Sequence, residues 1–207
     1  MKQHKLFRIE AALIAAVIAV LFSGFWLQEE QNRLADQMIR LHVIANSDRE
    51  EDQKLKLAVR DRILEVSREF YPSDCTDRRQ AENLLKKRLD DLEQAGAEVI
   101  TQAGYSYPIH AELTQCWFPT KEYNDFALPA GKYTALRVII GEGEGKNWWC
   151  VAFPPLCAGV AGQSVEWAEQ AGYFTSEQAQ LMTREGDGYI LKFYGMELIG
   201  KIREVLA

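Results

Sequence analysis

Apolar residues occupy every second position from Ile39 to Ala45. This period of two is typical of a β-strand, whose successive side chains point to opposite faces of a sheet. The run Asn46-Ser47-Asp48 then interrupts the pattern. Ser47 and Glu50 lie three residues apart, which is the spacing of a capping box. The pattern therefore predicts a strand followed directly by a helix.

Two long amphipathic helices are predicted next. The first has apolar residues spaced by three or four between Leu55 and Phe70. It should end at Tyr71-Pro72, because the residue before a proline avoids helical angles. The second helix should begin near Thr76 and end at Gly104, since glycine is a common C-terminal cap.

The period returns to two from Tyr107 through Cys116, which predicts a second strand. The segment Tyr133–Ile140 is rich in β-branched residues and, apart from Arg137, apolar on both faces. We therefore expect a central strand there. We interpret Gly141–Lys146 as a hairpin loop and Asn147–Phe153 as the partner strand of that hairpin. Pro154-Pro155 should end the sheet.

The end of the chain predicts short helices over Ser164–Gly172 and Ser176–Arg184, and a final helix over 191–207. The expected fold class is α/β or α+β, with a mixed sheet of four or five strands covered on one side by the two long helices and a helical C-terminal extension. The expected organisation is an N-terminal signal or anchor (1–27), a stalk (28–38), the main domain (39–160) and an extension that packs on the same domain (161–207).

A charge-free segment spans residues 11–27, with three basic residues before it and Glu29 and Glu30 after it. This order is typical of an exported chain whose basic side stays in the cytoplasm. The segment is near the lower limit for crossing ~30 Å of hydrocarbon as a helix. Phe25, Trp26 and Leu27 are bulky where a signal peptidase prefers small side chains, which favours an uncleaved anchor. Cleavage stays open as the alternative.

The chain has a formal net charge of −6. The first 27 residues hold three basic groups and Glu10, so the remainder carries −8. An acidic chain without basic clusters argues against nucleic acid, whose affinity comes largely from phosphate neutralisation. It also argues against lying flat on anionic lipid.

The glycines of Gly141–Gly145 do not form a nucleotide-binding motif. A phosphate loop needs four residues between its glycines and a hydroxyl residue after the lysine, whereas here three residues intervene and Asn147 follows. The dinucleotide fingerprint would precede a helix and not a strand. His42 and His110 are the only histidines after the apolar segment, and no Cys-x-x-Cys occurs. We therefore expect no cofactor, no metal and no small-molecule substrate.

Four cysteines are disulfide candidates: Cys75, Cys116, Cys150 and Cys157. In an exported chain four cysteines allow three full pairings, and Cys150 and Cys157 bracket a proline turn that could bring them together. The alternative is a cysteine–histidine hydrolase that acts on peptide or cell-wall material. His110 and Cys116 lie roughly 20 Å apart along one strand and cannot form its dyad. His42 could still meet Cys116 or Cys150 across the sheet.

Aromatic residues gather near the predicted sheet. Trp148 and Trp149 are neighbours on a strand, so their side chains should point to opposite faces, one into the core and the other toward a helix, a loop or a partner. The alternative is that most of these residues have a structural role and only cover the sheet. Rigid aromatic anchors are, however, also typical of binding hot spots. We interpret Ser47 as a cap and assign no catalytic residue. The candidate partner-binding residues are His42, Asn46, Asp48, Phe118, Pro119, Lys121, Tyr123, Trp148 and Trp149.

Three segments form long, specific motifs: RLHVIANSD (Arg40–Asp48), CWFPTKEY (Cys116–Tyr123) and LPAGKYTALRVIIGEGEGKNWWCVAFPPLC (Leu128–Cys157). In this order, after a short apolar segment, they resemble the stage II sporulation protein R family. The resemblance covers roughly Arg40 to Cys157, and the last fifty residues match only loosely.

The resemblance implies intercellular signalling in endospore-forming bacteria. Such a protein would be exported from the forespore into the space between the two membranes. It would not itself be an enzyme. There it would activate a membrane-embedded aspartic protease of the mother-cell membrane, which cleaves a precursor sigma factor (sigma-E). The protease would be the partner, and the membrane would be touched only through the N-terminal segment. An envelope scaffold protein without signalling activity is a further alternative.

Overall fold

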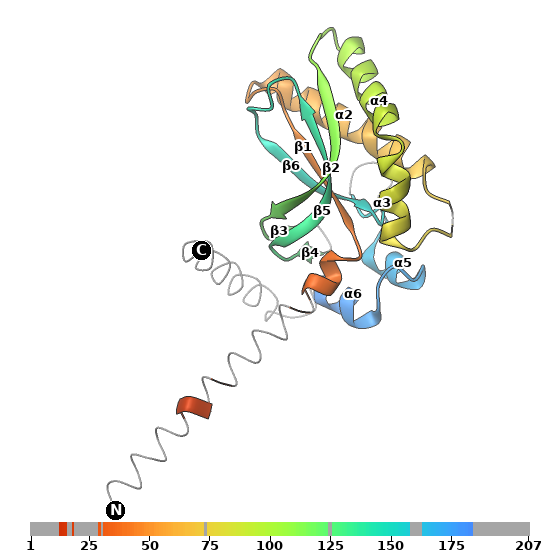
Figure 1. Cartoon of the computed structure of the whole chain (residues 1–207). Helices are drawn as coiled ribbons and strands as arrows, with labels where there is room; N and C mark the ends of the chain where they lie inside the picture. The colour runs from red at the N-terminus through yellow and green to blue at the C-terminus, as the bar shows by residue number, and fades with distance from the viewer. Residues whose placement is uncertain are drawn as a thin grey trace, which may run out of the picture. The chain divides into compact units, whose positions relative to one another are not determined.

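A computed structural model describes residues 13–15, 18, 29, 31–72, 74–123, 126–157 and 163–183 (Figure 1). The chain divides into two compact units, residues 1–34 and residues 35–207. Most of the expected anchor over 11–27 lies outside the described residues, as does the expected final helix over 191–207. Where the chain is described, no helix is both long enough and apolar enough to cross a membrane.

A four-stranded mixed sheet forms the centre of the second unit. Its strands are β1 (Ile39–Ile44), β2 (Ile109–Phe118), β5 (Gly131–Ile140) and β6 (Asn147–Phe153), in the spatial order β2-β5-β1-β6. β1 runs parallel to β5 and antiparallel to β6, and β2 runs antiparallel to β5. The expected mixed sheet with β5 between two neighbours is confirmed.

The expected hairpin between β5 and β6 is wrong, because β1 lies between these two strands. All six residues of β1 are buried, which means that both faces and both edges of this strand are covered. An interior strand of this kind satisfies its backbone groups only when a neighbour pairs on each side. The segment Gly141–Lys146 consequently crosses the end of β1, and it begins with a turn in which Gly143 N donates to the Ile140 carbonyl at 3.2 Å.

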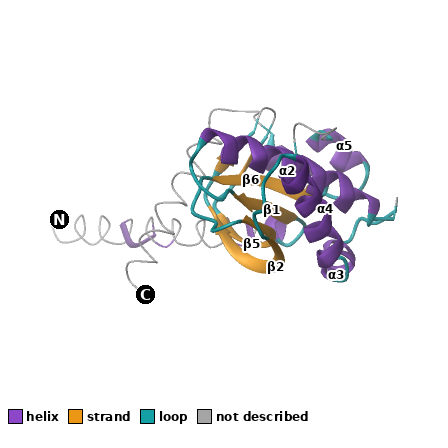
Figure 2. Cartoon of the chain, turned by 90° about the horizontal axis from the view of Figure 1, so that it is seen from above, coloured by secondary structure: helices purple, strands orange, loops and turns teal. Residues whose placement is uncertain are grey.

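Three helices pack on one face of the sheet: α2 (Glu50–Glu69), α3 (Arg78–Lys86) and α4 (Leu89–Gln102), of which Figure 2 shows α2 and α4 on the same side. The second long helix predicted from the sequence is thus two helices, interrupted at Lys87 and Arg88. Leu85 and Leu92 flank the break and are both fully buried, so the apolar spacing continues through it and does not reveal it. Gly104 follows α4 with a φ of 84°, as expected of a C-terminal cap.

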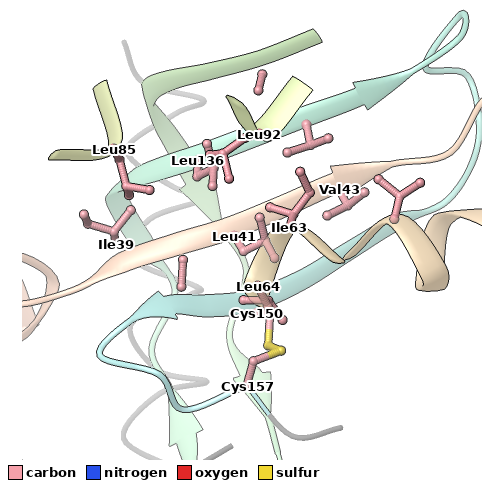
Figure 3. Close-up of a cluster of buried hydrophobic side chains, with 14 of the residues drawn as sticks. Ile39, Leu41, Val43, Ile63, Leu64, Leu85, Leu92, Leu136, Cys150 and Cys157 are labelled. Carbon is pink, nitrogen blue, oxygen red and sulfur yellow. A yellow bond between two sulfur atoms is a disulfide. The ribbon is translucent and has the colours of Figure 1, made fainter. Parts of the chain in front are cut away.

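The core lies between this face of the sheet and the helices (Figure 3). Leu41 and Val43 of β1 meet Ile63 of α2 and Leu92 of α4, all at 0% exposure. Each such side chain contributes about 1.5–3 kcal/mol by leaving water. The disulfide between Cys150 and Cys157 lies in the same cluster.

Smaller elements complete the second unit. β3 (Lys121–Glu122) and β4 (Ala127–Leu128) form a two-stranded sheet. The short helices expected near the end are present as α5 (Val165–Gln170) and α6 (Ser176–Met182). A bridge between Phe126 and Thr183 joins the end of α6 to the β3–β4 sheet.

Candidate functional site

The corner after β1, which comprises Ala45–Asp48, is bound by the loop Gly141–Lys146, here called the glycine loop. Gly145 N donates to the Ala45 carbonyl at 2.9 Å, and Glu144 N donates to the Asn46 carbonyl at 3.2 Å. A Cβ atom at Gly145 would collide with the Ser47 carbonyl oxygen. The glycines therefore permit a close approach of two backbones and do not cradle a phosphate.

Side chains of the corner also face inward. The Asn46 amide oxygen accepts from Glu142 N at 3.1 Å, and the Asp48 carboxylate accepts from Lys146 N at 2.8 Å. Because Asn46 and Asp48 are held by backbone groups of the glycine loop, their first role is to join β1 to β6. Whether they also meet a partner stays a prediction.

The predicted capping box at Ser47 is wrong. The N-cap of α2 is Arg49, and no side chain caps that helix end. Ser47 Oγ instead donates to the Asp52 carboxylate at 2.5 Å, and Asn46 donates to the same oxygen at 2.9 Å. Burial alone would raise the pKa of Asp52, but these hydrogen bonds and the nearby Arg49 hold that pKa below its ordinary value. The corner thus fastens to the first turn of α2 through a buried carboxylate.

The face of the sheet opposite α2, α3 and α4, here called the second face, contains a fully buried arginine. The Arg40 guanidinium lies 4.3 Å from the Phe118 ring centre and 4.9 Å from that of Tyr133. It donates to the Cys150 carbonyl at 2.9 Å and to the Tyr123 hydroxyl at 2.9 Å, and that hydroxyl lies 3.2 Å from the Trp149 carbonyl. Arg40 therefore ties β1, β2, β5 and β6 together at one end of the second face.

Phe118 and Tyr123 both contact Arg40 and so help to hold these strands together. Phe118 is 0% exposed, so it presents nothing to a partner, and its assignment as a contact residue is corrected to a supporting one. Tyr123 is only partly exposed and its hydroxyl is engaged by Arg40. Burial raises the pKa of Tyr123 and that of Tyr133, the latter to about 12, so both stay neutral phenols at physiological pH.

One residue from each strand forms a row across the second face: Trp149 of β6, His42 of β1, Arg137 of β5 and Glu112 of β2. The His42 and Trp149 rings stack with centroids 3.8 Å apart. Arg137 lies opposite His42 in the register and forms an ion pair with Glu112 at 3.0 Å. The row is aromatic at one end and charged at the other, and both charged side chains are 37% exposed.

His42 is neutral and lacks the partners of a catalytic base. Burial lowers its pKa, and the Arg137 charge lowers it further against the opposing effect of a hydrogen bond with Asn147 at 2.9 Å. The ring nitrogen Nδ1 is buried and has no hydrogen-bond partner among the described residues. A triad-type base would have an orienting carboxylate at this nitrogen.

The cysteine pairs that the hydrolase required do not form. Cys150 is bonded to Cys157, and its register partner Leu41 places it on the helix-covered face, away from His42. Cys116 lies opposite Tyr133, four residues along β5 from the position opposite His42, which is roughly 13 Å. Cys75 and Cys116 are free thiols, and burial raises the pKa of both.

The two tryptophans point to opposite faces, as predicted. Trp148 packs against the core cluster on the helix side, where the Arg60 guanidinium lies 4.4 Å from its ring centre. Trp149 lies on the second face. Pro119 and Lys121 are partly exposed near the end of β2.

Sequence reasoning missed four residues of this region. Arg40, Arg137 and Glu112 have no local signal, since a charged residue in a strand is most simply a solvated one. Trp117 is 60% exposed on β2, and its large apolar side chain was a signal that could have selected it. No group of three or more potential metal ligands occurs within the described part of the chain.

The fold and the second face define an α+β protein whose exposed chemistry is aromatic and ionic. The family model for stage II sporulation protein R matches residues 35–162, and the chain belongs to this family. Stage II sporulation protein R of Bacillus subtilis (strain 168) is 36% identical over 135 residues, which cover 63% of this chain and 59% of the relative. The match thus spans less than two thirds of that relative's length. No solved structure matches the chain. Family membership assigns the protein a role in sporulation.

Proposed function

We propose that this chain is an exported signalling protein of endospore formation. It activates a membrane-embedded aspartic protease that processes a precursor sigma factor (sigma-E) in the mother cell. The observation that carries the proposal is the family match over residues 35–162. The order of charges around residues 11–27 supports export from the forespore, with the following domain in the space between the two membranes. That segment then acts as a membrane anchor.

The row on the second face is the proposed contact surface for the protease. Trp149 and Arg137 are residue types enriched in binding hot spots, and both are partly exposed. Arg40 and Phe118 lie beneath this surface and hold the strands that present it. A rigid surface loses little conformational entropy on binding, which favours affinity.

Activation by contact requires a difference in affinity. The chain must bind the active arrangement of the protease, such as its dimer, more tightly than the inactive one. A hundredfold preference corresponds to about 2.7 kcal/mol. One or two hot-spot residues, at about 2 kcal/mol or more each, supply a difference of this size.

The cysteine–histidine hydrolase is not favoured by a specific observation. Cys150 is oxidised in the structure, and neither Cys150 nor Cys116 lies beside His42. An activator that works by contact needs no thiol, so the two functions differ in their dependence on cysteine.

Co-expression of the full chain with the protease and the sigma precursor in a non-sporulating host tests the proposal. Export of the wild-type chain should produce cleavage of the precursor. Arg137→Ala should lower cleavage at least ~tenfold, equivalent to ~1.4 kcal/mol of lost contact. The matched control is Arg62→Ala, which removes an exposed helical ion pair with Glu65 and should leave cleavage unchanged.

Two outcomes reject the signalling function. An exported and folded chain that leaves the precursor intact favours an envelope scaffold protein. Turnover of peptides or cell-wall fragments by the purified chain favours the hydrolase. Equal cleavage by both arginine variants would instead remove the second face as the contact surface while leaving the signalling function in place.

A further inference from the structure

The strand β2 forms one edge of the four-stranded sheet. It is ten residues long and pairs with β5 along its whole length in a continuous register. The other long side of an edge strand presents unpaired backbone groups, and natural proteins usually protect such an edge with charged residues, proline or a bulge. The sequence Leu113–Phe118 contains none of these, so half of this edge lacks such protection among the residues that the structure describes.

The direction of each backbone group follows from two hydrogen bonds. Gly141 N donates to the Pro108 carbonyl, so even-numbered residues of this segment face β5. Ala111 N donates instead to the Glu93 carboxylate at 2.7 Å, so odd-numbered residues face outward. Glu93 therefore covers the edge near Ala111. The outward groups of Leu113, Gln115 and Trp117 lie beyond its reach.

The same stretch is uncharged and partly accessible. Trp117 is 60% exposed, and Gln115 is exposed beside it. The segment from Leu113 to Pro119 carries no charged side chain, although the chain has a net charge of −6. Two copies of an acidic chain repel each other least where an uncharged surface of this kind meets its own copy.

We propose that two copies of this chain pair antiparallel through the β2 edge, about a two-fold axis at Cys116. In this register Gln115 of each copy lies opposite Trp117 of the other, as a hydrogen-bonded pair. Cys116 then lies opposite Cys116 of the second copy. The two exposed Trp117 side chains become diagonal neighbours and leave water together.

A second copy fits this edge better than an unrelated strand because the register is complementary to itself. A two-fold interface uses the same surface on both partners, and every outward N–H between Gln115 and Trp117 finds a carbonyl of the other copy. Opposed residues of a non-hydrogen-bonded pair have Cα atoms ~4.5 Å apart, within the ~4.4–6.8 Å range of disulfides. The half-exposed free thiol of Cys116 occupies this position.

An added disulfide oxidant can therefore trap the dimer. Two Cys116 thiols lose two protons and two electrons as the S–S bond forms, and the oxidant disulfide is reduced to two thiols. Burial raises the pKa of Cys116, so trapping should be faster at mildly alkaline pH, where more thiolate is present.

Sedimentation of the purified full chain in mild detergent, under reducing conditions, tests the pairing. Wild-type protein should show a concentration-dependent dimer. Trp117→Lys places two positive charges near the axis, within the ~10 Å screening length of the buffer, and should weaken dimerisation at least ~tenfold. Gln102→Lys makes a similar charge change at an exposed site at the end of α4 and should leave the dimer unchanged. Both variants keep the N-terminal segment, so self-association through that segment cannot produce the difference.

Oxidised glutathione and a non-reducing gel test the register. Wild-type protein should form a covalent dimer that Cys116→Ser abolishes and Cys75→Ser preserves. A monomer at all concentrations, or cross-linking at equal rates in wild type and Trp117→Lys, would overturn the proposal. If the chain is monomeric and Trp117→Lys nevertheless impairs activation of the protease, the edge instead accepts a strand of another protein. No protease is present in either assay, so failure here is distinct from failure of the signalling function.

Discussion

His42 stacks on Trp149 with ring centroids 3.8 Å apart and an angle of 19° between the planes. His42 is 7% exposed and lies opposite Arg137 in the sheet. A proton on this ring would place a second positive charge in a poorly solvated site. The stack therefore favours the neutral imidazole and couples the packing of the second face to pH.

Acidification should destabilise the protein through His42. Its pKa is lowered in the folded state, so the unfolded chain takes up the proton first, at about its ordinary pKa of 6.5. The stabilising contribution is fully present above pH 6.5 and is lost as the pH falls through the lower folded-state value. Urea denaturation of wild type and His42→Gln at a series of pH values measures this loss.

His42→Gln should flatten the pH dependence of stability in the window below pH 6.5, because the glutamine side chain takes up no proton there. The lowered pKa of Asp52 acts in the same direction, but only below its ordinary value of 3.8. Parallel profiles of wild type and His42→Gln above that range would contradict the assignment.

Gly145→Ala should destabilise the joint between the corner and the glycine loop. The new Cβ would collide with the Ser47 carbonyl, which is backbone and cannot rotate away. Overpacking of this kind costs about 1–3 kcal/mol. Gly131→Ala is the matched control, because its Cβ would meet only the Tyr133 ring at an ordinary contact distance of 3.4 Å. Thermal and urea unfolding should separate the two variants, and equal stabilities would show that the loop can relax.

Local periodicity predicts the individual elements of this fold but not their pairing. The period of two from Ile39 is present in β1, and the helical spacing from Leu55 is present in α2. The position of β6 depends on which strand needs a second neighbour, and β1 needs one because both of its faces are buried. The hairpin interpretation of Gly141–Lys146 followed chain proximity. It missed the crossing over β1, which the hydrogen bonds to the corner stabilise.

The site was predictable only where one strand decides the geometry. Opposite directions for Trp148 and Trp149 follow from strand geometry alone, and the structure has them. The burial of Phe118 depends on Arg40, a residue 78 positions away in the chain, and no local pattern encodes that contact. The row that includes Arg137 and Glu112 similarly requires the strand order, because its members come from four different strands.

Tyr123→Phe should cost more stability than Tyr107→Phe, although both remove a hydroxyl that accepts from an arginine. The Tyr123 hydroxyl accepts from buried Arg40 at 2.9 Å, and its loss leaves a charged donor unpaired in the interior. That loss costs about 1–3 kcal/mol. The Tyr107 hydroxyl accepts from exposed Arg49 at 2.8 Å, where water can take its place on the guanidinium, so we expect a smaller loss. Urea denaturation of both variants measures the difference, and equal costs would mean that water reaches Arg40.

Replacement of all four cysteines by serine should lower stability without abolishing activation of the protease. Cys150 and Cys157 lie seven residues apart, and a disulfide that closes so short a loop contributes about 2–3 kcal/mol. Free-thiol labelling of denatured wild-type protein should detect two thiols before reduction, those of Cys75 and Cys116, and four afterwards. In co-expression at a temperature where the variant folds, precursor cleavage should persist, because an activator that works by contact uses no thiol chemistry. A folded but inactive serine variant would instead point to a cysteine nucleophile, and it would remove the basis for a contact mechanism.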